Sequence, residues 1–326
     1  MSAPGTFVQV PPPFPLAGEA AALAAAVLWA GSISIYRFWG KGVPPHTLNL
    51  LKSTVAALFL GASLLVVRPP APAEARTWVA LALSGFIGLA LGDTAFFAAL
   101  KRLGAHATSS VFCMSPPLAA LLAVFYLGEK LSLKETVGMV CTVGAVGGVL
   151  YFGRRNTTFL SELPGKTLAV GALYALTASL ANALGLVIAR EAFQKADVLW
   201  GTFLRMGTAA VALVGIRHLD RPQPALRSVF TGRKQVAALI FAAFSGTYLG
   251  VLLLSVGTKY AKAGLTSALS STFPLWIIPI ARIYLKEQVD LRSAGCTLLA
   301  LAGVFLMVVP EPVLIQTLAA LRRLIV

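Results

Sequence analysis

Charged residues are scarce in this chain of 326 residues, where they make up 12% of the sequence. That is about half the share that is usual in soluble domains. Acidic residues are scarcer still, with 12 Asp and Glu against 27 Lys and Arg. A water-soluble protein of this size needs more charge to cover its surface, and a disordered chain has far less apolar content. The composition therefore excludes an ordinary soluble enzyme and a disordered protein.

Cysteine and histidine are also rare, with three of each: Cys113, Cys141, Cys296, His46, His106 and His218. The cysteines lie inside apolar stretches and lack the spacing of metal ligands or redox pairs. The histidines fall in predicted loops or at helix ends. We therefore predict no metal site and no cofactor, and we interpret the cysteines as small buried hydrophobic residues.

The net charge of +15 would ordinarily favour nucleic acid as a partner. Here the basic residues are spread along the whole chain, in ones and twos between apolar stretches. That distribution is typical of a membrane protein whose charges lie in its loops, next to lipid headgroups. We therefore expect lipid rather than nucleic acid as the partner of these charges.

Hydrophobic residues are abundant, at 57% of the chain, with a mean hydropathy of +0.81. They gather in ten stretches, each near the roughly 20 residues that a membrane helix needs. The stretches span residues 17–38, 46–67, 77–98, 105–127, 133–152, 167–189, 197–216, 235–256, 263–284 and 292–309. This pattern predicts an all-α integral membrane protein with ten transmembrane helices. Outside them, we expect a disordered tail over 1–16 and an amphipathic tail over 310–326.

The chain also matches itself when it is displaced by 158 residues without gaps. The matched pairs include Gly88 with Gly246, Gly92 with Gly250, Pro116 with Pro274, and Glu129 with Glu287. Chance similarity between apolar helices would share Leu and Ala rather than these residues. The two repeats, 17–152 and 167–309, are joined by a linker over 153–166. Because each holds five predicted helices, an odd number, the second is predicted to be inverted in the membrane, and substrate sites in such folds lie near the bilayer midplane between the repeats.

Several of these motifs resemble the drug/metabolite transporter superfamily, in its ten-helix EamA branch. The first half carries Gly92-Asp93-Thr94, Ser115-Pro116 and Leu127-Gly128-Glu129, and the second half carries the weaker Phe273-Pro274 and Leu285-Lys286-Glu287. The resemblance covers about 17–309. It implies ten helices, a central cavity and export or exchange of small metabolites such as amino acids. Because Val251 stands where the first half has Asp93, the resemblance extends to Asp93 in one half only.

Three ionisable residues lie inside predicted membrane helices: Lys52, Arg205 and Asp93. Such residues are expensive in a bilayer and are functional candidates by default. The long stems of Lys52 and Arg205 also allow them to reach the headgroups, which would make them anchors. Three roles are open for Asp93: it binds a proton, it pairs with one of these cations, or it lies at the membrane interface. A cavity holding all three would suit an anionic or zwitterionic solute.

A second layer of candidates comes from polar, aromatic and proline residues within the spans. We include Trp29, Ser32, Asn182, Phe112, Pro116, Tyr248, Ser271, Pro274 and Trp276 as residues that line the cavity. The prolines free backbone carbonyls at matching places in the two halves, which points to a binding region. Small hydroxyl residues also let helices approach closely, and aromatic residues also pack or anchor to lipid.

Some polar residues at predicted helix ends have simpler interpretations. We expect His106 to be solvated at the start of the fourth helix. We expect Glu129 and Glu287 to form local salt bridges with Lys130 and Lys286, respectively. None of these residues is assigned to transport.

Two arguments about orientation disagree. The loops on the side of the termini hold fewer basic residues than the opposite loops, so the positive-inside rule would place both termini outside. The family resemblance implies cytoplasmic termini instead. One arginine-rich loop supplies much of the imbalance, so we predict cytoplasmic termini in a bacterial plasma membrane.

The function predicted from the sequence is that of a secondary transporter, not an enzyme. It would move an amino acid or a similar zwitterionic or anionic solute by alternating access, as an exporter or exchanger, driven by proton coupling or by plain exchange. We expect a monomer or a weak homodimer. A channel or receptor-like membrane protein is one alternative. An intramembrane enzyme is another, although Gly61-Ala62-Ser63-Leu64 lacks the second glycine of a serine-protease motif.

Overall fold

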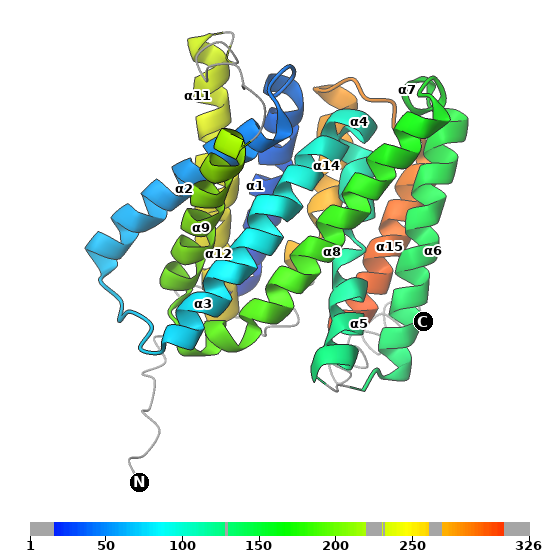
Figure 1. Ribbon diagram of the computed structural model, residues 1–326. Helices are drawn as coiled ribbons and strands as arrows, with labels where there is room; N and C mark the ends of the chain where they lie inside the picture. Colours follow the sequence, from blue (N-terminus) through cyan, green and yellow to red (C-terminus); the bar gives the residue numbers. More distant parts are fainter. Residues whose placement is uncertain (1–15, 128–129, 220–229, 231, 261–268, 310–326) are drawn as a thin grey trace.

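The computed structural model describes residues 16–127, 130–219, 230, 232–260 and 269–309 (Figure 1). Its helical elements are α1 (Ala17–Trp39), α2 (Pro45–Val67), α3 (Ala75–Ser84), η1 (Gly85–Gly92), α4 (Asp93–Phe112), α5 (Ser115–Leu127), α6 (Leu133–Asn156), α7 (Thr158–Ser161), α8 (Gly165–Lys195), α9 (Val198–Leu219), α11 (Arg233–Ala242), η2 (Ala243–Leu249), α12 (Gly250–Tyr260), α14 (Phe273–Ile283) and α15 (Leu291–Val308). The elements η1 and η2 are π-helical. The predicted tails, Glu129 and most of the loop before α11 lie outside the described residues.

Eight helical stretches among the described residues are long and apolar enough to cross a membrane. Two shorter apolar helices, Ser115–Phe125 and Phe273–Ile283, accompany them. Together they overlap all ten stretches expected from hydropathy. The all-α integral membrane fold predicted from the sequence is therefore confirmed, and the number of spans is consistent with ten.

Helix starts follow local sequence signals. Pro45 begins α2, where a residue without an N–H costs no helical hydrogen bond. Ser132 and Glu135 form a capping box at the start of α6. The Asp290 carboxylate caps α15 by accepting from the backbone N–H groups of Arg292 and Ser293. A side-chain hydrogen bond with Asn156, followed by these backbone bonds, holds the pKa of Asp290 below its usual range.

Only Gly104 separates the third and fourth predicted spans. The chain is helical from α3 through η1 into α4, and a kink at Gly104, whose φ of +83° and ψ of 176° are not helical, divides α4 into two helices between the predicted ends at 98 and 105. The fourth span is itself interrupted after Phe112, and α5 starts at Ser115. Pro116 explains the interruption, since proline is tolerated in the first turn of a new helix but breaks a continuous one.

The second half contains a matching interruption. A turn at Ser271–Thr272 precedes α14, and Pro274 is the second residue of that helix. Residues 263–268, the predicted beginning of the ninth span, lie outside the described residues. Helix breaks thus stand at corresponding places in the two halves, next to Pro116 and Pro274.

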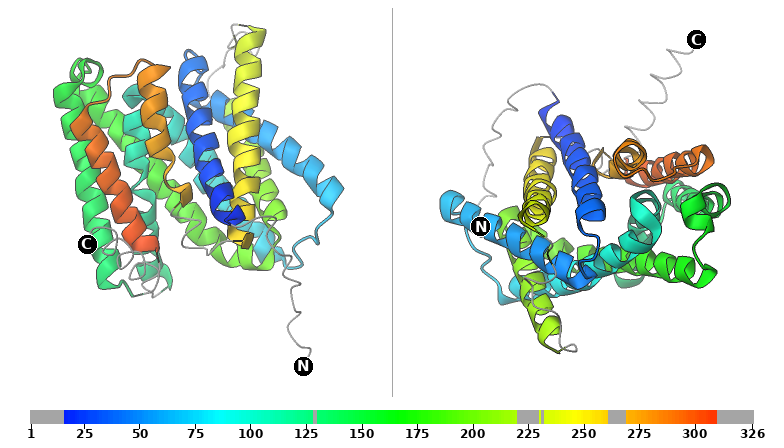
Figure 2. Two further views of the ribbon diagram at one scale, coloured as in Figure 1. Left: turned by 180° about the vertical axis from the view of Figure 1, so that it is seen from behind. Right: turned by 90° about the horizontal axis from the view of Figure 1, so that it is seen from above.

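Helices from different halves pack against each other throughout the bundle (Figures 1 and 2). The closest partners are α6 with α15, α2 with α9, α1 with α12, and α4 with α8. Glycine permits the tightest of these approaches. A Cβ atom on Gly138 of α6 would lie 2.5 Å from the carbonyl oxygen of Gly303 in α15. Small residues at crossings are what membrane helices use in place of a hydrophobic driving force.

Candidate functional site

An ion pair joins α2 to the junction of η1 and α4. The Lys52 ammonium donates to the Asp93 carboxylate, and the exposed fractions of the two side chains are 11% and 19%. Lys52 as a whole is 8% exposed. Of the alternatives that the sequence left open for Asp93, the structure therefore shows pairing with Lys52. The ammonium is directed to this carboxylate within the bundle, where a lone charge would be costly.

Asn49, one turn before Lys52, holds the backbone that carries Asp93. Its side-chain amide donates to the carbonyl oxygens of Leu89 and Ala90 at 2.8 and 3.1 Å, and to Thr94 Oγ1 at 3.0 Å. Asn49 is fully buried. A π-helix disturbs the regular hydrogen-bond ladder, and buried carbonyls need another donor. Asn49 supplies that donor, and sequence reasoning missed it because its carbonyl partners lie 40 and 41 positions away along the chain.

Both halves contain a π-helical segment at the same repeat position. Displaced by 158 residues, η1 falls on η2. The only sequence signal for them is the repeated glycine pairs. At Gly246 an added Cβ would lie 2.3 Å from Ser32 Cβ, and at Gly88 it would lie 3.4 Å from Gly185 Cα. Because π-helical segments are frequent at functional sites, this matched pair marks the middle of the third and eighth spans.

Arg205 lies on α9, which packs against both η1 and α2. Its Nη2 lies 3.5 Å from the place of a Cβ on Gly88, and its guanidinium is 5.6 Å from the ring centroid of Phe193. The Nε atom is buried and has no hydrogen-bond partner among the described residues. Arg205 therefore carries a buried donor beside η1 and is not part of the ion pair.

Aromatic rings from α1, α4 and α14 form a chain of edge-to-face contacts. Phe273 of α14 lies edge-on to Trp29 of α1 at 6.3 Å and to Phe112 of α4 at 6.4 Å. Phe112 continues to Phe96 at 5.3 Å. The predicted residues Trp29 and Phe112 are thus brought together by Phe273. Edge-to-face contacts of this kind stabilise packing and leave ring faces for other contacts.

Several predicted polar residues bond to other helices. Ser32 Oγ donates to the carbonyl oxygen of Ala242 at 2.9 Å, and Asn182 Oδ1 accepts from Ser115 Oγ at 3.0 Å. The Tyr248 and Ser63 hydroxyls lie 2.7 Å apart. These bonds hold α1, α8 and η2 against their neighbours, which is the packing role that small polar residues often play in membranes.

The remaining candidates lie at the helix break before α14. Pro274 is buried, Ser271 is half-buried, and Trp276 is 38% exposed. The indole N–H of Trp276 donates to Thr272 Oγ1 at 3.3 Å. Pro116 occupies the corresponding break before α5.

Comparison with known proteins identifies the family. The model of the EamA-like transporter family matches residues 16–151 and again residues 169–309. The chain belongs to the EamA-like transporter family. The resemblance expected from the sequence motifs is therefore confirmed, and the protein is a membrane transporter rather than an enzyme. A transporter of this kind acts on a small molecule in a lipid environment.

Two curated relatives and one solved structure are similar to this EamA transporter. An uncharacterized transporter of Archaeoglobus fulgidus is 23% identical over 288 residues, covering 88% of this chain and 96% of the relative. A WAT1-related chloroplastic protein of Arabidopsis thaliana is 25% identical over 304 residues, covering 84% of this chain and 68% of the relative. A protein of known crystal structure superposes with a TM-score of 0.63 at 18% identity, over 88% of this chain and 95% of that one. This last likeness shows the fold.

Two expectations about helix ends in the EamA transporter were wrong. His106 is 6% exposed rather than solvated, because the bend at Gly104 turns it inward, and its Nε2 lies 3.1 Å from Ser293 Oγ on α15. Glu287 pairs with Arg37 at 2.8 Å rather than with its neighbour Lys286. The error arose because adjacent charges in sequence need not face each other in space. The prediction for Glu129 falls outside the described residues.

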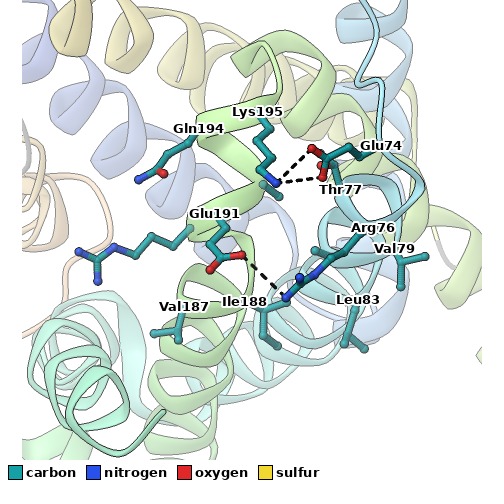
Figure 3. Close-up of a pocket in the computed structure, with 13 residues that line it drawn as sticks. Glu74, Arg76, Thr77, Val79, Leu83, Val187, Ile188, Glu191, Gln194 and Lys195 are labelled. Atoms are coloured by element: carbon teal, nitrogen blue, oxygen red, sulfur yellow. Dashed lines mark hydrogen bonds and ion pairs between the residues drawn. The ribbon is translucent and has the colours of Figure 1, made fainter. Parts of the chain in front are cut away.

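A surface hollow of 520 Å³ lies between α3 and the end of α8 (Figure 3). Its lining includes Glu74, Arg76, Glu191 and Lys195, and none of the predicted site residues. Lys195 pairs with Glu74 at 2.9 Å, and Arg76 lies 4.0 Å from Glu191. These side chains are half-exposed or more. We place the candidate site at the buried Lys52–Asp93 ion pair because exposed ion pairs, such as those in this hollow, contribute little interaction free energy.

Proposed function

We propose that this EamA transporter moves a small zwitterionic or anionic metabolite, such as an amino acid, by alternating access. The observation that carries the proposal is the Lys52–Asp93 ion pair buried in the bundle, with the Arg205 Nε–H, which has no hydrogen-bond partner among the described residues, beside η1. Together the three groups sum to one positive charge. A solute with a carboxylate or phosphate would complement that excess.

The ion pair gives a physical route to binding. An incoming carboxylate accepts hydrogen bonds from Arg205 and competes with Asp93 for the Lys52 ammonium. Asp93 then needs a new partner, which a substrate ammonium group or a proton supplies. Because a buried charge without a partner is costly, exchange of partners is favoured over simple separation. Proton coupling and plain exchange differ only in which of these two cations Asp93 takes.

Packing between the halves supports two inverted repeats, over 17–152 and 167–309. Under the repeat alignment the α6–α15 and α2–α9 contacts map onto themselves, and the contacts of α1 with η2 and α12 map onto those of α8 with η1 and α4. Hydrogen bonds between the halves show the same correspondence. Ser32 bonds to the carbonyl before η2, and Ser84, just before η1, bonds to the carbonyl of Gly185 in α8. Such an arrangement supports rocking of the repeats about the central ion pair.

Direction, membrane and assembly remain part of the proposal. We infer export or exchange across a bacterial plasma membrane by a monomer or weak homodimer. α1 begins and α15 ends toward the same end of the bundle (Figure 2, left). We infer that this end faces the cytoplasm. A C-terminal reporter active only outside the cytoplasm would contradict that orientation.

Ligand-dependent thermal stability tests the proposed site. Purified protein is screened against amino acids, nucleosides, sugar phosphates and lipophilic cations. We expect a zwitterionic or anionic solute to raise the Tm, and Arg205→Gln and Lys52→Gln to abolish that rise. Arg76→Gln, which removes an exposed cation of the surface hollow, is the matched control and retains it. Equal stabilisation in all three variants would show that Lys52 and Arg205 do not contact substrate.

A second assay separates a carrier from a channel. Saturable counterflow of the stabilising solute in proteoliposomes is the result expected of a carrier. Flux that rises linearly with concentration and shows no counterflow would favour the channel alternative.

A further inference from the structure

Arg37, near the end of α1, joins the two halves of the chain. Its Nε donates to Glu287 Oε1 at 2.8 Å, and its Nη1 donates to the carbonyl oxygens of Leu100 and Lys101 at 3.1 and 3.0 Å. The exposed fractions of the Arg37 and Glu287 side chains are only 16% and 13%. One guanidinium thus fixes the end of α1, the last turn before the bend in α4, and the connection after α14.

Glu287 is held a second time, by the bend in α4. Both carboxylate oxygens accept from the backbone N–H of Ala105, at 3.1 and 3.0 Å. That N–H begins a new helical segment because Gly104 leaves the helical conformation, and a carboxylate is favourable at such a start. A Cβ on Gly104 would lie 2.7 Å from Glu287 Oε1. Glycine at 104 therefore serves both the positive φ and the close approach of the carboxylate.

The ion pairs between halves differ at the two ends of the bundle. At the end of the bundle where α1 ends and α11 begins, which is uppermost in Figure 1, Gln235 of α11 also donates to the carbonyl oxygen of Trp39 at 2.7 Å. At the other end, Lys195 pairs with Glu74, and their side chains are 50% and 54% exposed. A shielded, multiply bonded ion pair therefore ties the halves at one end, and a solvated pair does so at the other.

We propose that Arg37, Glu287 and the Ala105 N–H form a latch that closes this end of the transporter to water. The latch must open for the central ion pair to be reached from this side, so the proposal rests on alternating access. Opening frees the carboxylate from both donors and exposes the carbonyls of Leu100 and Lys101 to water. Arg37 and Glu287 are then positioning residues, which set the access of the site without contacting substrate.

Side-specific labelling tests the latch. In a background with the three native cysteines replaced by alanine, Thr94→Cys places a thiol next to Asp93. A membrane-impermeant maleimide is added to one side of oriented proteoliposomes, and Lys41→Cys, exposed at the α1–α2 corner, reports the latch side. Glu287→Gln keeps an acceptor for Ala105 but loses the charge. Loss of one charge-assisted bond shifts the opening equilibrium by about tenfold or more, so latch-side labelling of Thr94→Cys should rise by that factor.

Matched variants separate the latch from general loosening. Glu74→Gln removes the exposed pair at the opposite end and should leave latch-side labelling unchanged. Arg37→Lys keeps the charge and loses the two carbonyl bonds, so it should give an intermediate rise, and it carries the test if Glu287→Gln does not fold.

Latch-side labelling that stays at the parent rate in Glu287→Gln, or in Arg37→Lys where that variant carries the test, would overturn the proposal. It would do so even if the variant were less stable. Because labelling needs no substrate, this result is independent of whether the central site binds the proposed solutes.

Discussion

Removal of the Asp93 carboxylate is the sharpest perturbation of the central ion pair. Asp93→Asn keeps the shape of the side chain and leaves the Lys52 ammonium without its partner. Loss of one member of a buried pair costs about 3 to 5 kcal/mol, whereas an exposed pair contributes about 0 to 1 kcal/mol. With exposed fractions of 11% and 19%, this pair belongs with the buried ones. We therefore expect Asp93→Asn to lower the free energy of unfolding by about 3 kcal/mol or more.

A double-mutant cycle shows whether the cost comes from the unpaired charge. Lys52→Met alone should also destabilise the protein, because it strands the carboxylate. The double variant Lys52→Met/Asp93→Leu removes both charges and should recover most of the loss. The free energies are measured by unfolding in mixed micelles of detergent and dodecyl sulfate. A loss below about 1 kcal/mol for Asp93→Asn would refute the reasoning, since it would mean that water already solvates the pair.

Three further predictions concern residues around this pair and at one helix start. Asn49→Ala leaves the carbonyls of η1 without a donor, so the same assay should show a loss of about 1 to 3 kcal/mol. Gly246→Ala should cost about 1 to 3 kcal/mol because its Cβ meets Ser32, while Gly31→Ala, which has open space in α1, should be neutral or stabilising; equal effects would contradict the packing described here. The lowered pKa of Asp290 contributes stability that is present above the ordinary carboxyl pKa and is lost as pH falls below it, so Asp290→Asn should flatten the acid side of a Tm-against-pH profile.

The sequence predicted what depends on composition and repetition. Apolar stretches of membrane length located the helices, and glycine, proline and glutamate in one register revealed two matching halves. Asp93 and Lys52 were also singled out, because charge inside an apolar span is rare enough to be noticed. These features depend on composition and on spacing along the chain, so they can be recognised from the sequence alone.

Other features depend on the three-dimensional contact of distant segments. The π-helical forms of η1 and η2 follow from how their glycine faces pack on α8 and α1, respectively, and no propensity marks them. Asn49 and Arg37 matter because of the carbonyls that they meet 40 and more positions away. His106 was misjudged because its neighbourhood is set by Ser293, in the other half of the chain. Tertiary partners of this kind cannot be inferred from spacing along one helix.

Counterflow of a stabilising solute in proteoliposomes tests the central claim most directly. The protein with Arg205 intact, Arg205→Gln and the exposed control Arg76→Gln are compared at equal reconstituted amounts. The account predicts saturable counterflow with Arg205 intact and in the control, and its loss in Arg205→Gln with the labelling pattern of the latch unchanged. Full counterflow in Arg205→Gln would contradict the placement of the site beside η1.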